Sequence, residues 1–431
     1  MERLVSRIGN RISFFLLMSG LLISCFLKYV FNIGDFSAVL IAIPVLIAVV
    51  GDRDEIIAMC VCCIPFYSVL PIHYVVVISI FMYLCKYFND VKLDYIFILI
   101  ILLVMWEITH CFEWDLNIKQ LVEFVIPYAV LIVLISIRNI EVDYCFIVRV
   151  YSIAVCFVYL ILIVRLLISS GFNLNMAFSN VTRLGLKSED EVAEVIINPN
   201  SLGFMCSLGI TGLAQLNRFG QKKSYDMYIM ITMLIAGALT LSKTYLVCLI
   251  IMAMLFFISI KGDIKKKAQY LLGCVSLTLV AVLAIYFAFP SVIETFAARF
   301  CVDDITSGRT DLFNQYNAYL FSSPNVLMYG VGVLDFRNKL TPIINDVPHN
   351  CIQEILIAWG IPGFFMFFVL IVAMIWRSKK ENTNQTLVNY IPLILLLIKC
   401  QVGQMIGSTY TMLAFEIVYL SLCQNFNQVE Q

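Results

Sequence analysis

The sequence predicts an all-α polytopic membrane protein: a bundle of about 12–14 transmembrane helices with a large outer loop that contains short amphipathic helices. The first observation behind this fold class is composition, because 61% of the 431 residues are hydrophobic and only 13% are charged. The second is a mean hydropathy of +0.92. A soluble domain is about 45–50% apolar and about 25% charged, so these values exclude a soluble enzyme, a disordered chain and a secreted disulfide scaffold.

Charge and the metal-binding residue types exclude further classes. The 29 Lys and Arg residues balance 29 Asp and Glu residues, whereas a nucleic-acid-binding protein carries a basic excess. Most of the 15 cysteines lie inside apolar runs, where free Cys behaves as a small hydrophobe. The three histidines, His73, His110 and His349, are far apart in the sequence. We therefore expect no nucleic-acid partner, no metal site and no cofactor.

The apolar segments are the individual transmembrane elements. A spanning helix needs about 20 mostly apolar residues, and long uniform segments suit helices better than barrel strands. The basic N-terminus leads directly into the first segment, which we expect to be retained as a span. The candidate spans are residues 12–31, 36–50, 56–71, 74–88, 93–112, 119–137, 144–168, 200–217, 227–241, 244–260, 268–289, 350–376, 389–407 and 409–423.

The basic residues between the spans set the orientation, because cytoplasmic loops are enriched in Lys and Arg. With the N-terminus inside, the inner segments carry most of the 29 basic residues, so we expect both termini in the cytoplasm. The domain organisation is then three sets of transmembrane helices and two outer loops long enough to be functional. The helical sets are 1–168, 200–289 and 350–431, and the loops are 169–199 and 290–349.

The large outer loop contains two patches that could carry chemistry. Its end reads Pro348-His349-Asn350 and leads into an apolar helix in which Gly360 and Gly363 allow close packing. An imidazole suits proton transfer near neutral pH, although an interfacial histidine that binds lipid headgroups is the alternative. Earlier in the loop, Ser307-Gly308-Arg309-Thr310 places a guanidinium, which fits phosphate oxygens, after a flexible turn. A solvated surface arginine is the alternative there.

Two further patches lie at expected outer ends of helices. Leu241-Ser242-Lys243-Thr244 is a tight break between two apolar spans, where Lys243 could meet a lipid phosphate or simply extend to the interface. The loop 169–199 contains Arg183, whose role stays open. It ends in Asn198-Pro199-Asn200, where the asparagines suit helix capping and the helix N-terminus could face an anion.

Six ionisable residues are expected at membrane depth, where a charge needs a partner or a cavity. We expect internal ion pairs first and ligand contacts second. Glu107 and His110 are three residues apart on one helix face and could pair. The others are Arg149, Arg165, Lys399 and Glu416.

Taken in order, the four patches resemble the O-antigen polymerase and O-antigen ligase family of bacterial polysaccharide assembly proteins. NPNSLG opens a span, LSKT breaks a helical hairpin, SGRTDLFNQYNAYLFSSPNVLMYGVG fills the large loop, and PHNCIQEILIAWGIPGFF closes it. The resemblance rests on this order within roughly residues 180–370. The first 170 residues add only their many-spanning character.

The resemblance implies a metal-independent, inverting glycosyltransferase in the bacterial cytoplasmic membrane, with its active site on the outer face. His349 matches the family's histidine as general base, and Arg309 matches a basic residue that binds the diphosphate. Lys243 stands where the family more often has arginine, and lysine cannot make the two-point contact. Arg183 matches as a second diphosphate-binding residue less clearly. The expected supporting residues are Asn350, Ser307 and Asn200.

The substrate expected from the resemblance is an oligosaccharide on a polyprenyl diphosphate, in contact with membrane lipid. We expect a polymerase of capsule, exopolysaccharide or O-antigen repeat units, with a chain-length regulator and a flippase as partners. The first alternative is an O-antigen ligase that transfers the glycan to lipid A–core. The second is a lipid-linked oligosaccharide flippase, which would show cations along a central cavity and two related halves.

Overall fold

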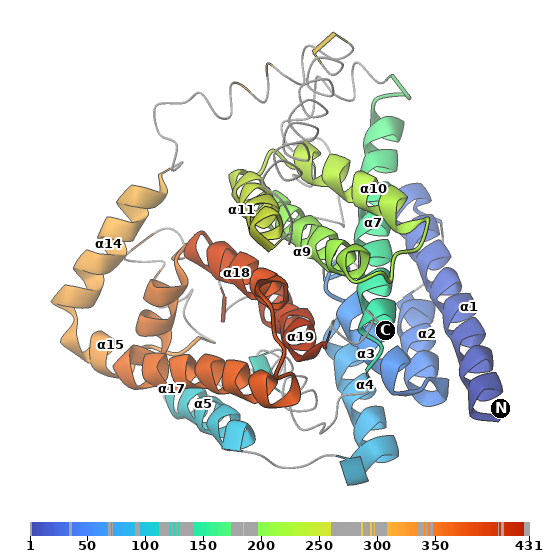
Figure 1. The fold of residues 1–431 in the computed structure, drawn as a ribbon. Coiled ribbons are helices and arrows are strands. Elements are labelled where there is room, and N and C mark those ends of the chain that lie inside the picture. The colour runs from blue at the N-terminus through green and yellow to red at the C-terminus, as the bar shows by residue number, and fades with distance from the viewer. Residues whose placement is uncertain are drawn as a thin grey trace.

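Within the residues that it describes, the structure, a computed structural model, consists of helices joined by turns (Figure 1). The predicted all-α class is therefore confirmed. The described residues are 2–33, 37–67, 70, 72–90, 95–111, 121, 124–125, 128, 142–173, 184, 197–259, 286–287, 294, 297, 308–333, 340, 344, 348–403, 405–406 and 409–425.

The helices follow the apolar segments of the sequence. The N-terminal part forms α1 (Glu2–Phe31), α2 (Ser37–Val50), α3 (Arg53–Cys62), α4 (Ile72–Tyr87), the 3₁₀ helix η1 (Phe88–Asp90), α5 (Tyr95–Cys111) and α7 (Tyr144–Ser169). The C-terminal part forms α9 (Pro199–Arg218), α10 (Asp226–Leu239), α11 (Lys243–Ser259), α14 (Arg309–Ser322), α15 (Pro324–Tyr329), α17 (Cys351–Glu381), α18 (Leu387–Gln401) and α19 (Thr409–Cys423).

Helix length and composition support a membrane protein. Among the described residues, Arg11–Phe31, Tyr144–Ser169 and Cys351–Glu381 are each long and apolar enough to cross a membrane, and seven shorter apolar helices accompany them. The predicted spans 119–137 and 268–289 lie mostly outside the described residues. The total of 12–14 spans, the domain boundaries and the cytoplasmic termini therefore remain predictions.

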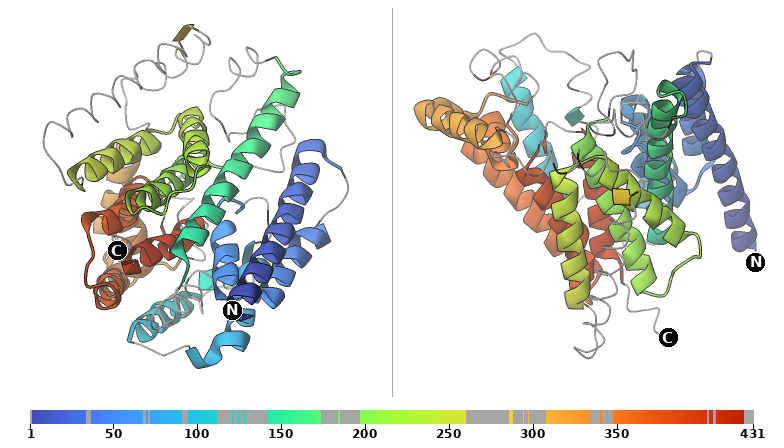
Figure 2. Two further views of the ribbon diagram at one scale, coloured as in Figure 1. Left: turned by 45° about the vertical axis from the view of Figure 1, so that its right-hand side comes forward. Right: turned by 90° about the horizontal axis from the view of Figure 1, so that it is seen from above.

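Helix α9 lies at the centre of the bundle, against α7, α10, α11 and α18 (Figure 1, Figure 2). Glycines on α9 let its neighbours approach closely. A Cβ atom on Gly209 would lie 2.7 Å from the Met233 sulfur, and one on Gly212 would lie 2.7 Å from Val148 Cγ1. Such contacts bury α9 almost completely and hold its polar N-terminus in a fixed position.

The ionisable residues expected at membrane depth differ in their surroundings. Arg149 of α7 forms the predicted kind of internal ion pair, because its Nε lies 3.0 Å from Asp226 Oδ1 of α10. For Glu416 of α19 the expectation of an ion pair is wrong in the described part of the chain. Its side chain is fully buried and neither carboxylate oxygen has a hydrogen-bond partner there.

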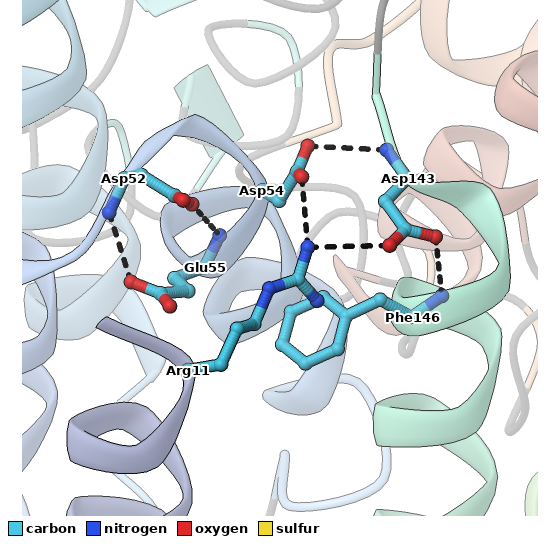
Figure 3. Close-up of polar contacts among 6 residues, drawn as sticks. All are labelled: Arg11, Asp52, Asp54, Glu55, Asp143 and Phe146. Carbon is cyan, nitrogen blue, oxygen red and sulfur yellow. Dashed lines mark hydrogen bonds and ion pairs between the residues drawn. The ribbon is translucent and has the colours of Figure 1, made fainter. Parts of the chain in front are cut away.

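One arginine joins three helices of the N-terminal part, as Figure 3 shows. Arg11 Nη2 of α1 lies 3.0 Å from Asp54 Oδ2 and 3.2 Å from Asp143 Oδ2. The guanidinium stacks on the Phe146 ring of α7, 3.6 Å from its centroid. The Asp143 backbone N–H also donates to Asp54 Oδ1 at 3.1 Å. Asp54 is 3% exposed, so its charge depends on these donors.

We expect Asp54→Asn to cost less stability at high pH than at low pH. Burial raises the pKa of the Asp54 carboxyl above its ordinary value, and the Asp143 N–H and the Arg11 guanidinium oppose this. A raised folded-state pKa contributes stability that is fully present below the unfolded-state pKa and is lost as the pH rises through the folded-state value. Asparagine mimics the neutral form at every pH. The measurement is thermal unfolding of both proteins at about pH 5 and about pH 8. A difference in stability between wild type and Asp54→Asn that grew with pH would contradict the prediction.

Candidate functional site

A cavity of about 500 Å³ lies where the starts of α11, α14 and α17 meet the end of α18. Five of the seven residues that the sequence singled out line it: Asn200, Lys243, Arg309, His349 and Asn350. The other two, Arg183 and Ser307, lie outside the described residues. Residues from four separate patches, spread over 150 positions of sequence between Asn200 and Asn350, therefore share one cavity.

Lys243 is placed by the sharp turn between α10 and α11. Leu241 adopts a left-handed backbone conformation with φ 47°, which ends α10 and reverses the chain. Ser242 Oγ then accepts from the Tyr245 N–H at 3.2 Å and donates to Asn200 Oδ1 at 3.0 Å. This hydroxyl fixes the start of α11 against the start of α9, and Lys243 is the first residue of α11.

Arg309 is the first residue of α14. Gly308 precedes it with φ 79°, a left-handed conformation that glycine adopts without strain. A Cβ atom at Gly308 would meet nothing within 4 Å, so the glycine serves the backbone turn rather than close packing. Helix α14 is one of the short helices predicted for the segment 290–349, and it buries Tyr316 and Leu320. The helix ends at Ser322, before Pro324 begins α15.

His349 lies directly before the capped start of α17. Asn350 is the N-cap, and its Oδ1 accepts from the Ile352 N–H at 3.0 Å and the Gln353 N–H at 3.3 Å. The remaining amide group of Asn350 donates to Gln401 Oε1 at 3.1 Å. These bonds tie the start of α17 to the end of α18, so the backbone beside His349 is held from both sides.

Gln353 is a cavity residue that the sequence did not single out. Its Nε2 donates to the Phe313 carbonyl oxygen and to Asn317 Oδ1, each at 2.8 Å. The side chain is 3% exposed, so this amide sets the distance between α17 and α14. One signal was available: Gln353 and Glu354 are two polar residues one turn after His349, directly before the apolar run of the helix. Gln401, which also lines the cavity, carried no such signal.

The electrostatics of the cavity favour an anion. Helices α11, α14 and α17 all begin at it, and each helix N-terminus carries a partial positive charge. Lys243 and Arg309 add two full charges, and both side chains are half-buried. No Asp or Glu lines the cavity in the described part of the chain. The arrangement can therefore bind a phosphate or diphosphate beside an imidazole.

Apolar residues form much of the rest of the wall. They are Val247 of α11, Leu312 and Phe313 of α14, and Ile398 and Val402 at the end of α18. Val247 lies one turn along α11 from Lys243 and is 45% exposed. An anionic headgroup with an apolar tail would meet complementary surfaces on both parts of the cavity.

Comparison with known proteins agrees with this geometry. Residues 228–368 match the family model described as O-antigen ligase, and this segment contains Lys243, Arg309, His349 and Gln353. No curated protein matches the chain. The resemblance predicted from the four sequence patches is thus confirmed: residues 228–368 are similar to the O-antigen ligase family, which supports a membrane enzyme of the O-antigen polymerase or ligase type.

Proposed function

We propose that the protein polymerises polyprenyl-diphosphate-linked oligosaccharide repeat units, of capsule, exopolysaccharide or O-antigen, at the outer face of the bacterial cytoplasmic membrane. The observation that carries this proposal is the cavity in which two cations, three helix N-termini and one imidazole meet. The family match over residues 228–368 supports a lipid-linked oligosaccharide as substrate. In this scheme the growing chain leaves one polyprenyl diphosphate and joins the non-reducing end of the next repeat.

The proposed reaction is a direct displacement. His349 takes the proton of the acceptor hydroxyl as its oxygen attacks the anomeric carbon, and the bond from that carbon to the diphosphate oxygen breaks. Arg309 and Lys243 stabilise the negative charge on the leaving polyprenyl diphosphate, and His349 then releases the proton to water. A positioned base contributes about 10²–10⁴ in rate, and a preset electrostatic donor about 10²–10³. A single displacement inverts the anomeric centre.

The main alternative is an O-antigen ligase, which the description of the matching family favours. The same residues would act, but the acceptor would be lipid A–core. Cells that lack a polymerase carry single-repeat surface glycan, whereas cells that lack a ligase carry unmodified core and retain the lipid-linked polymer. A chain-length regulator and a flippase are the partners that the polymerase would need.

Purified protein in proteoliposomes tests the proposal against both alternatives. We expect lipid-linked repeats alone, without an energy source, to give a ladder of longer lipid-linked glycans and free polyprenyl diphosphate. Growth only after addition of lipid A–core would identify a ligase. Movement of the repeat across the bilayer without any new glycosidic bond would identify a flippase and overturn the proposal.

A further inference from the structure

Helix α17 is interrupted one-third of the way along, and another segment fills the interruption. Gly360 has φ 64° and ψ −168°, which no helix contains. Pro362 has no N–H, so the Ala358 carbonyl loses its helical donor. The Gly332 N–H replaces it at 2.7 Å. Residues 330–333, which follow α15, therefore lie along the break and complete its hydrogen bonds.

Two more carbonyl oxygens at the break are satisfied from outside α17. The Val331 N–H donates to the Ile357 carbonyl at 2.8 Å. The indole Nε1 of Trp106, on α5, donates to the Trp359 carbonyl at 3.0 Å. Three successive carbonyls of α17 thus take their donors from residues 331–332 and from α5, which joins three elements at one place (Figure 1).

Glycines make the backbones fit at this junction. Gly330 has φ 83°, and a Cβ atom there would lie 2.3 Å from the Ala358 oxygen. A Cβ atom on Gly360 would lie 2.6 Å from the Met328 oxygen. Gly330 therefore leaves room for the backbone of α17 at Ala358, and Gly360 leaves room for the backbone at Met328. No larger side chain fits at either position.

Glu107 of α5 holds the same segment through a buried carboxylate. Both of its oxygens lie 2.9 Å from the Val333 backbone nitrogen, and Oε2 accepts from Trp359 Nε1 at 2.8 Å. The side chain is fully buried. A carboxylate accepts these bonds more strongly than a neutral acid would, so Glu107 supplies a negative charge at the junction.

His110, one turn along α5, contacts the junction through both ring nitrogens. Nε2 lies 2.8 Å from the Tyr329 carbonyl oxygen, and Nδ1 lies 2.8 Å from the Trp106 carbonyl oxygen. Both partners are acceptors. A neutral imidazole has only one N–H, so both contacts are hydrogen bonds only when His110 is the imidazolium. Glu107 provides the compensating charge on the same helix.

Three further ionisable groups lie close to Glu107 and His110 in the described part of the chain. Tyr128 interacts electrostatically with Glu107 and with Glu354 of α17, and the Tyr329 hydroxyl belongs to the segment that His110 contacts through its backbone. Residues 330–333 and residues 355–363 of α17 contain no ionisable side chain. Imidazole is the side chain that ordinarily changes charge between about pH 5 and 8.

We propose that Glu107 and His110 are positioning residues: they hold residues 329–333 against the break in α17, and His110 does so only while it carries a second proton. This junction connects the two helices of the candidate site. The segment 329–333 lies at the end of the chain stretch that begins with Arg309 and runs through α14 and α15. The part of α17 before the break begins beside His349. The proton on His110 thereby sets how firmly α14, which begins at Arg309, is held to α17, which begins two residues after His349.

Hydrogen exchange on the unmodified protein in nanodiscs tests the junction without any assay of activity. The amides of Val331, Gly332 and Val333 all donate to acceptors at the junction. We expect the protection of a peptide covering 329–333 to fall about tenfold between about pH 5.5 and pH 8, after correction for the intrinsic exchange rate, because a charge-assisted hydrogen bond is lost. Equal protection at both values overturns the proposal.

Two variants identify the group that titrates. The glutamine amide of His110→Gln is neutral at every pH, so we expect weak protection of 329–333 that no longer depends on pH. Thr232→Val is the matched control, because the Thr232 hydroxyl likewise donates to a carbonyl of its own helix, that of Tyr228 on α10, and the variant should keep the wild-type pH dependence. A wild-type pH dependence in His110→Gln would assign the proton to another group and overturn the proposal.

The effect on activity rests on the proposed function and is read separately. Neutral His349 is the base in the proposed function, so the transfer rate should rise with pH as the imidazole loses its proton. Release of the junction should lower the transfer rate at high pH, and the two effects together give a bell-shaped profile. We expect His110→Gln to remove the falling limb and keep the rising one. A bell that persists in this variant overturns the role of the junction in activity. Absence of any glycosyl transfer would instead overturn the proposed function, and the exchange result would stand by itself.

Discussion

Replacement of His349 by alanine is expected to reduce the rate of glycan chain growth about 10²–10⁴-fold, because the acceptor hydroxyl loses its base. In cells with equal protein abundance, the ladder of surface glycans should collapse toward a single repeat. His349→Gln should be equally inactive, since an amide keeps the size and polarity of the ring but cannot take a proton. The fold should survive both changes, because the N-cap bonds at the start of α17 belong to Asn350.

A measurement of the affinity for the lipid-linked donor distinguishes loss of the general base from loss of the binding site. Donor affinity depends on Arg309, Lys243 and the helix N-termini, so it should change little in either His349 variant while the rate constant falls. An unchanged ladder of chain lengths in His349→Ala would show that the base is another group. Loss of donor binding together with activity would make His349 a binding residue instead.

Local rules bring out five of the residues that line the cavity, while their roles stay predictions. Lys243, Arg309 and His349 each lie at or just before the start of a helix, where capping residues and turn glycines mark the position. A polar group at such a place faces the membrane surface or a cavity. The order of the patches along the chain then matched one family, and the cavity brings their described members together.

The sequence could not predict the contacts that depend on distant partners. The sequence predicts Gly360 and Gly363 in one continuous helix, since apolar residues continue on both sides. The break is stabilised because residues 331–332, about thirty positions earlier, and Trp106 of α5 supply the missing donors. The expected pairing of Glu107 with His110 likewise gave no hint that both side chains bind backbone atoms near Tyr329 and Val333.

Replacement of Arg309 by alanine is expected to reduce the rate about 10²–10³-fold, because one preset donor to the leaving diphosphate is lost. Arg309→Lys is the more informative variant. Lysine keeps the charge and the helical start of α14 but cannot make the two parallel hydrogen bonds that a guanidinium makes to phosphate oxygens. We expect Arg309→Lys to recover only part of the loss, about tenfold below the wild type, with single-turnover transfer in proteoliposomes as the measurement.

Lys380→Ala is the matched control for charge. Lys380 lies near the opposite end of α17 from the cavity, with its ammonium 3.8 Å from the centroid of the Trp376 ring, and its loss should leave transfer at the wild-type rate. A role of the guanidinium geometry and a role of the charge alone then predict different orders of activity among the Arg309 variants. If geometry matters, activity falls from arginine to lysine to alanine, whereas a purely electrostatic role makes lysine equal to arginine. Wild-type activity in Arg309→Ala would reduce Arg309 to a solvated residue and leave Lys243 and the helix N-termini to bind the diphosphate.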